Sequence, residues 1–94
     1  MLREAGAYKL PVYVTENGIA DSRDRHRAAY IRDHVRVLRQ VVRAGKVDVR
    51  GYFYWSLEDN LEWSGGYAPK FGLFTKARRM RASAKVFRAE TFRR

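Results

Sequence analysis

Two stretches of the sequence carry side chains that could do chemistry. In the first, Thr15-Glu16-Asn17-Gly18, a carboxylate follows an apolar and β-branched run. Asn and Gly both tolerate positive φ and so form tight turns, but a turn has no use for the glutamate before it. Glu16 is therefore either a solvated carboxylate beside a hairpin turn or a group held at a strand end to act on a ligand.

The second stretch, YWSLEDNLEWSGGY at residues 54–67, combines tryptophan with acidic and amide side chains. A flat indole face packs on the C–H groups of a sugar ring, and carboxylates or amides bind the sugar hydroxyls. This combination is typical of carbohydrate recognition. Asp59 and Asn60 are expected to form turns and brace the loop, because their short polar side chains hydrogen-bond to nearby backbone groups.

The elements that position these stretches are predicted to be a strand, a long helix and a second strand. Residues 12–16 and 49–55 are rich in β-branched and aromatic side chains, which favours strands. Between them, Asp24 is predicted to be the N-cap and Gly45 the C′ residue of a helix over 27–44. Its apolar positions recur at helical spacing, with arginines on the other face. The apolar positions are Tyr30, Ile31, Val35, Leu38, Val41 and Val42, and the arginines are Arg32, Arg36, Arg39 and Arg43.

A strand, a helix and a strand in this order predict a βαβ unit of an α/β fold, with parallel neighbouring strands. Residues 19–25 are polar, so we expect no returning strand after Asn17-Gly18. This excludes the interpretation of Asn17-Gly18 as a hairpin turn. The carboxyl ends of parallel strands share one edge of the sheet, where α/β folds bind ligands. We therefore expect Glu16 and Trp55 to lie at the same edge.

A further helix is predicted over residues 83–92, with Val86, Phe87 and Phe92 on its buried side. The two histidines are not expected to act in catalysis. His34 lies among the apolar positions of the long helix, which predicts a buried core histidine, and His26 is expected to be exposed.

The composition limits the possible partners. The chain has 94 residues and no cysteine, so it is at most one small domain without disulfides or thiolate metal sites. No spacing of His, Asp and Glu fits a metal site, and we expect no metal. No leader and no apolar run of membrane-spanning length is present, so we expect a soluble, cytoplasmic protein with no membrane partner.

Nucleic acid is the alternative partner, because the formal net charge is +10, from 20 Lys and Arg against 10 Asp and Glu. The arginines of the long helix could contact phosphates, but a solvated helix face carries such charges routinely. The stretch at residues 54–67 also interleaves its aromatic side chains with acids, which repel a phosphate backbone. We therefore expect no specific nucleic-acid binding.

Four blocks of residues resemble the C-terminal part of a β-glucosidase of glycoside hydrolase family 1. The blocks are YVTENGIAD at 13–21, the spaced pattern Asp24, Arg27, Tyr30 and His34, VRGYFYWSLEDNLEW at 49–63, and GYAPKFGL at 66–73. The resemblance implies a (β/α)8 or TIM barrel. It also implies a retaining β-glycosidase that hydrolyses terminal β-linked sugars in small-molecule glycosides and needs no cofactor.

The resemblance further implies roles for individual residues. Glu16 corresponds to the nucleophile, which attacks the anomeric carbon and forms a glycosyl-enzyme intermediate. The strand before Glu16 supplies the rigid segment that a nucleophile needs. The implied substrate-binding residues are Trp55, which stacks beneath the sugar, Glu62 and Trp63, which hydrogen-bond to its hydroxyls, Phe71 near the subsite wall, and Asn17.

The chain departs from the family in one catalytic group. The family's acid/base is a glutamate in an Asn-Glu-Pro motif, whereas Asn17 and Asn60 here precede Gly and Leu. A (β/α)8 barrel also needs roughly 250 residues. We therefore expect residues 1–94 to be the C-terminal portion of the barrel, about its last two βα units, with the nucleophile but without the acid/base. Alone, such a fragment is expected to be inactive and to need the remainder of the barrel; the alternative is a non-catalytic basic remnant.

Overall fold

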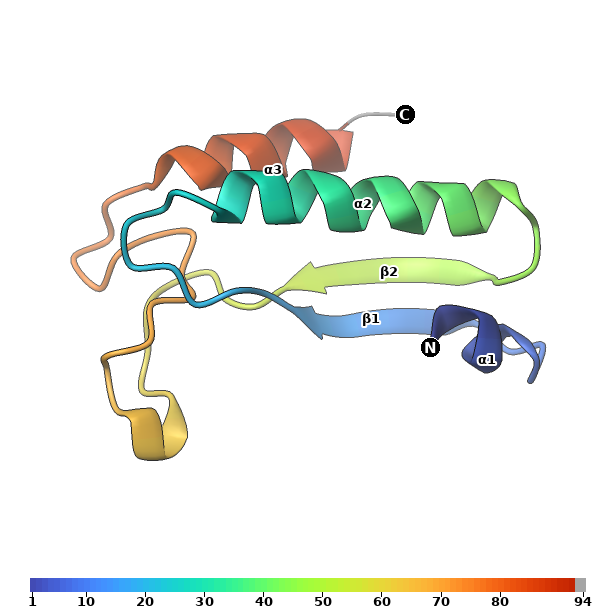
Figure 1. Cartoon of the computed structure of the whole chain (residues 1–94), viewed down its shortest axis with the longest axis horizontal. Helices are drawn as coiled ribbons and strands as arrows, with labels where there is room; N and C mark the ends of the chain where they lie inside the picture. Colours follow the sequence, from blue (N-terminus) through green and yellow to red (C-terminus); the bar gives the residue numbers. More distant parts are fainter. Residues whose placement is uncertain (93–94) are drawn as a thin grey trace.

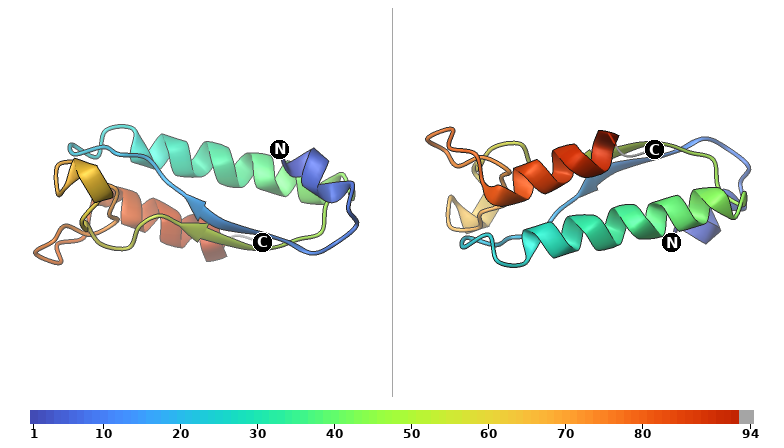
Figure 2. Two further views of the ribbon diagram at one scale, coloured as in Figure 1. Left: turned by 90° about the horizontal axis from the view of Figure 1, so that it is seen from below. Right: turned by 90° about the horizontal axis from the view of Figure 1, so that it is seen from above.

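The computed structural model describes residues 1–92, in which two parallel strands lie against two long helices (Figure 1). The elements are α1 (Leu2–Gly6), β1 (Val12–Asn17), α2 (Arg27–Arg43), β2 (Val49–Tyr54), the 3-10 helix η1 (Trp63–Gly65) and α3 (Ala82–Phe92). Helices α2 and α3 lie side by side over one face of the sheet (Figure 2). On the other face, Tyr13 and Phe53 remain 55% and 58% exposed.

The predicted βαβ unit is confirmed. Strands β1 and β2 pair in parallel, and α2 connects them. Strand β1 runs one residue beyond its predicted end, through Asn17, and β2 ends one residue earlier, at Tyr54. The N–H of Trp55 donates to the carbonyl of Asn17 (3.0 Å), which joins the two strand ends at one edge of the sheet.

The N-terminus of α2 differs from the prediction. His26 occupies the cap position, and a carboxylate oxygen of Asp21 accepts from the backbone N–H groups of His26 (2.8 Å) and Arg27 (3.1 Å). The prediction of Asp24 as the N-cap is therefore wrong. Its carboxylate instead accepts from the backbone N–H (3.0 Å) and the hydroxyl (2.6 Å) of Ser83 in the first turn of α3, where a negative charge is favoured by the helix dipole.

The other end of α2 follows the prediction. Gly45 adopts a φ of +69° directly after the Ala44 cap, and its N–H donates to the carbonyl of Val42 (3.0 Å). A left-handed residue at this position suits glycine, which has no Cβ to clash.

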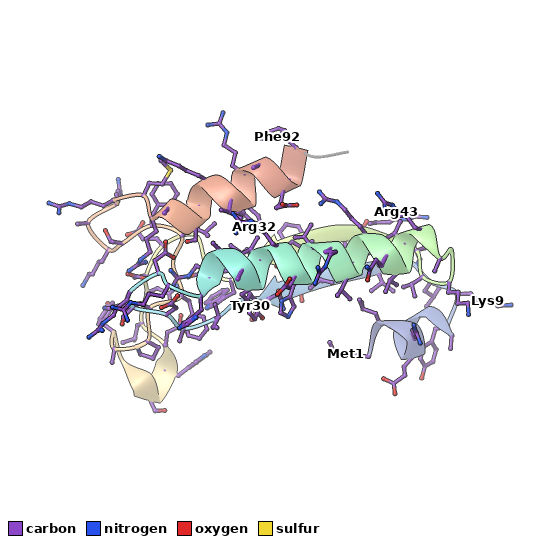
Figure 3. The ribbon with its side chains drawn as sticks, turned by 45° about the horizontal axis from the view of Figure 1, so that its top comes forward. Met1, Lys9, Tyr30, Arg32, Arg43 and Phe92 are labelled. Carbon is purple, nitrogen blue, oxygen red and sulfur yellow. The ribbon has the colours of Figure 1, made fainter. Side chains whose placement is uncertain are left out.

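The core lies between the two long helices and the sheet. Ile31, Leu73 and Ala84 are buried, and partly buried side chains pack around them; these are Val35, Tyr54, Phe74, Val86 and Phe87. Val86 and Phe87 thus lie on the buried side of α3, as predicted. Phe92 does not, because it sits on the last turn of α3, beyond the core, and is 78% exposed (Figure 3).

His34 is exposed, and its prediction as a core histidine is wrong, whereas His26 is exposed as expected. The imidazole stacks on Tyr30 with ring centroids 3.9 Å apart. It borders an open apolar hollow of about 260 Å³ between α2 and β1, to which Val14 and Leu38 also contribute. The apolar face of α2 is therefore wider than the two-stranded sheet that covers it.

Candidate functional site

Glu16 lies in an irregular stretch at the end of β1. Val14 pairs with Tyr52 and Asn17 with Tyr54, so three steps along β1 match two along β2. Thr15 and Glu16 are consequently both exposed, whereas Val14 and Asn17 are half-buried. Bulges of this kind re-aim side chains and are common next to active sites. Among residues 1–92, no side chain forms a hydrogen bond or ion pair with the Glu16 carboxylate.

Asn17 faces the helices. Its Oδ1 accepts a hydrogen bond from the hydroxyl of Tyr52 (2.8 Å), and its Nδ2 donates to the hydroxyl of Tyr30 on α2 (2.9 Å). Burial, followed by the nearby Tyr30 and Tyr54, raises the pKa of Tyr52 to about 12, so its hydroxyl keeps the donated proton at neutral pH. Both ends of the Asn17 amide are therefore occupied within the chain.

Trp55 and Glu62 meet just beyond the end of β2. The indole N–H of Trp55 donates to a carboxylate oxygen of Glu62 at 3.0 Å, and the Trp55 side chain is 37% exposed. Trp63 begins η1, which projects from this end of the molecule (Figure 1), and is 92% exposed. The hydrogen bond fixes the edge of the indole while leaving part of the ring accessible.

A hollow of about 550 Å³ opens beside Trp55. Its walls come from β1, β2 and the following loop, including Thr15, Phe53, Leu57 and Asn60. Of the predicted site residues, Trp55 lines this hollow. Phe71 is half-buried nearby, and its carbonyl accepts from the Tyr54 hydroxyl (3.2 Å). An open surface with aromatic and amide groups suits a sugar, whose C–H groups pack on an aromatic face and whose hydroxyls bond to polar groups.

The loop that carries Trp55 and Glu62 is braced by a buried ion pair. Asp59 and Arg81 form two parallel hydrogen bonds of 2.9 Å, and their side chains are 4% and 11% exposed. The N–H of Gly72 adds a third bond to Asp59 (2.9 Å). Burial acts to raise the pKa of Asp59, but these hydrogen bonds outweigh it and hold the pKa below its usual value. Asp59 thus braces the loop, as predicted.

Arg27 connects the base of the site to both helices. Its side chain is fully buried. The guanidinium donates to the hydroxyl of Tyr54 (3.1 Å), to the carbonyls of Asp21 (2.7 Å) and Lys70 (2.6 Å), and to the carboxylate of Asp24. A buried charge is tolerated when it is paired and fully hydrogen-bonded, as here.

Part of the basic charge on α2 is paired. Arg36 contacts Asp33 (3.0 Å), and Arg39 contacts Glu90 of α3 (2.7 Å), so this face carries ion pairs as well as solvated arginines. These pairs do not favour a phosphate-binding surface. Within residues 1–92, no helix has the length and apolar character needed to cross a membrane.

Comparison with known proteins identifies the family. Residues 3–91 match the model of glycosyl hydrolase family 1. The chain belongs to this family. The β-galactosidase of Sulfolobus acidocaldarius is 45% identical over 97% of the chain. The crystal structure of the β-glycosidase from Thermosphaera aggregans superposes with a TM-score of 0.88 at 43% identity over 96% of the chain, and the β-glucosidase from Pyrococcus furiosus superposes with 0.88 at 41%.

The chain is short for a family 1 protein. It spans 19% of the S. acidocaldarius protein and 20% of each of the two structures. The relatives named here are O-glycosyl hydrolases, and the matched solved structures are TIM barrels. The two strands and two helices described here are thus a small α/β piece of such a fold.

Local sequence patterns do not predict the contacts of several residues that support the site. Tyr30 and Tyr52 belong to the helix and strand patterns and to the blocks that resemble the family, but neither pattern indicates that their hydroxyls hold Asn17 from positions 13 and 35 residues away. Arg81 lies in a basic run, 22 residues after Asp59. Such partners become visible only when the register and the packing of the helices are known.

Proposed function

We propose that this chain supplies the nucleophile and part of the sugar subsite of a retaining β-glycosidase of family 1. Residues 1–94 would form the C-terminal portion of the barrel, about its last two βα units. The observation that carries the proposal is the position of Glu16, an exposed carboxylate without a partner in residues 1–92, at the same sheet edge as Trp55. That edge is where (β/α)8 barrels carry their active sites.

In the proposed mechanism, a carboxylate oxygen of Glu16 attacks the anomeric carbon, and the bond to the leaving oxygen breaks. A second carboxylic acid protonates that oxygen and then removes a proton from the water that hydrolyses the glycosyl-enzyme. In retaining enzymes the two carboxyl groups lie about 5–5.5 Å apart. The remaining barrel would supply the second one, because the chain contains no Asn-Glu-Pro motif.

The substrate would be a terminal β-linked hexoside. The relatives named above are β-galactosidase, β-glycosidase and β-glucosidase, which supports this class. We propose that Trp55 stacks on the sugar and that Glu62 and Trp63 bind its hydroxyls, with Phe71 at the subsite wall. The second oxygen of Glu62 supports this role, since the indole of Trp55 uses only one.

The test is a chimera in which residues 1–94 replace the segment that they match in the T. aggregans β-glycosidase. We expect the isolated chain to leave aryl β-glucosides intact and the chimera to hydrolyse them. Glu16→Gln should lower kcat of the chimera by several orders of magnitude, since it keeps the shape but removes the nucleophile. Glu4→Gln, a change in an exposed carboxylate of α1, is the matched control.

A 2-deoxy-2-fluoroglucoside should label Glu16, as read by peptide mass spectrometry. Labelling of another residue, or near-normal turnover of Glu16→Gln, contradicts the assignment.

A further inference from the structure

The bulge at the end of β1 decides which polar side chain faces the open side of the sheet. Side chains along a strand alternate between the two faces. With Val14 on the helix side, strict alternation would put Glu16 on the helix side as well and Asn17 on the open side. The extra residue between the Val14–Tyr52 and Asn17–Tyr54 pairs reverses this order. Glu16 is exposed and Asn17 faces α2.

Asn17, the residue directly after Glu16, is held at three points. Its amide bonds to the hydroxyls of Tyr30 (2.9 Å) and Tyr52 (2.8 Å), and its carbonyl accepts from the N–H of Trp55 (3.0 Å). Tyr30 belongs to α2 and Tyr52 to β2, so the three anchors come from the helix, the strand and the site loop. A bulge held on one side only could slip back into regular pairing.

The next residue confirms how closely the backbone is held. Gly18 passes against the carbonyl of Trp55, and a Cβ at this position would lie 1.8 Å from that oxygen. Only glycine fits. Directly after the bulge the backbone is thus packed against the carbonyl of Trp55, which limits how far residue 17 can shift.

We propose that Asn17 is a positioning residue for Glu16, held by the Tyr30 and Tyr52 hydroxyls so that the bulge turns the Glu16 carboxylate toward the substrate side. The inference rests on the proposed function in so far as Glu16 is the nucleophile. It differs from direct sugar binding by Asn17, because the amide faces α2 and both its oxygen and its nitrogen bond to tyrosine hydroxyls within the chain. A carboxamide suits the position, since it accepts from one tyrosine and donates to the other.

The first test measures turnover in the chimera. Asn17→Ala should lower kcat on the order of 100-fold with KM unchanged, because a misplaced nucleophile costs rate rather than binding. Tyr30→Phe and Tyr52→Phe each remove one anchor and keep the ring, so each should lower kcat less. In the double-Phe background, Asn17→Ala should add little, because its partners are already gone. Gln40→Ala, which removes an exposed carboxamide from α2, is the control and should leave kcat unchanged.

Two results would overturn the proposal. A raised KM with unchanged kcat in Asn17→Ala would mean direct contact with the sugar. A full effect of Asn17→Ala in the double-Phe background would mean that the tyrosines do not act through it. Failure of the nucleophile assignment is recognised separately, because Glu16→Gln would then keep its turnover.

A second test needs no catalysis and uses the 94-residue chain. Glu16 is coupled to glycinamide with a carbodiimide, and the extent of reaction is compared with that of the exposed Glu4 by mass spectrometry. Asn17→Ala should slow the reaction of Glu16 several-fold relative to Glu4, as loss of the bulge turns the carboxylate toward the helices. An unchanged ratio contradicts the positioning role even if Glu16 is not the nucleophile.

Discussion

The indole N–H of Trp55 donates a 3.0 Å hydrogen bond to the carboxylate of Glu62, seven residues further along the chain. The bond ties the aromatic surface at the end of β2 to the acidic loop that precedes η1. It holds the ring in one orientation without covering its face, since Trp55 stays 37% exposed. An aromatic platform that is fixed in advance binds a sugar with less loss of side-chain freedom.

Glu62→Gln in the chimera should raise KM for an aryl β-glucoside about tenfold and change kcat less. The variant can still accept from the Trp55 indole, but it loses the charge that strengthens hydrogen bonds to sugar hydroxyls. Glu62→Ala should raise KM further, because the indole also loses its partner. Steady-state kinetics over a range of substrate concentrations measure both values, with Glu4→Gln as control. A lower kcat at unchanged KM would instead point to a role of Glu62 in the chemical step.

Local patterns in the sequence predicted the elements, and long-range contacts explain what they missed. Strand β1, helix α2 and strand β2 follow from side-chain types and their periodicity. Both are properties of residues that are close together in the sequence. The bulge at Glu16 depends on the register against β2, where Asn17 bonds to Tyr52, a residue 35 positions further along the chain. Asp24 illustrates the same point: its carboxylate binds Ser83, a partner 59 residues away that no capping rule considers.

Burial was predicted less well than secondary structure. The helical pattern identifies an apolar face, but it does not say how much of that face is covered. His34 borders an open hollow and Phe92 sits beyond the core, so both are exposed although both occupy apolar positions. Helix α1 was missed because its five residues are too few for a periodic signal.

The Asp59–Arg81 pair should be critical for stability. Asp59→Ala or Arg81→Ala should each lower the free energy of unfolding by about 3–5 kcal/mol, because either change leaves a buried charge without its partner. Replacing both residues by leucine should cost much less than the two single changes together. Urea unfolding of the full chain, followed by circular dichroism, measures the differences.

The exposed pair of Asp33 and Arg36 provides the control for this prediction. Their side chains are 62% and 68% exposed, so Arg36→Ala should change stability by less than about 1 kcal/mol. Equal effects at the buried and exposed pairs would show that the Asp59–Arg81 pair does not hold the loop.

Tyr52 should make the chain sensitive to alkali. Burial raises its pKa from 10.0 to about 12 in the folded chain. The unfolded chain loses this proton near pH 10 and the folded chain only near pH 12, so the stabilising contribution is complete below pH 10 and declines between these values. The urea midpoint should therefore fall over this range. Tyr52→Phe should lower stability at neutral pH through the lost hydrogen bond, but flatten the alkaline decline.

Tyr8→Phe is the matched control. Because Tyr8 is 77% exposed, this substitution should not change the alkaline decline in stability. An alkaline decline of the same steepness in Tyr52→Phe would assign the effect to other groups.

Arg27 should not tolerate replacement by lysine. Its guanidinium serves Tyr54, Asp24 and two backbone carbonyls at once, and the side chain is fully buried. An ammonium has three donors on a flexible stem and cannot match this planar arrangement. Arg27→Lys should therefore lower the free energy of unfolding, and Arg27→Ala should lower it by about 3–5 kcal/mol, because Asp24 is left without its charge partner. The exposed Arg32 on the same helix is the control, with an expected change of less than about 0.5 kcal/mol in Arg32→Lys.

In the chimera, Arg27→Lys should also reduce turnover, since Tyr54 and the carbonyl of Lys70 anchor the loop that follows Trp55. Full stability and full turnover in Arg27→Lys would mean that a positive charge alone is sufficient there and that the fork-shaped geometry of the guanidinium has no role.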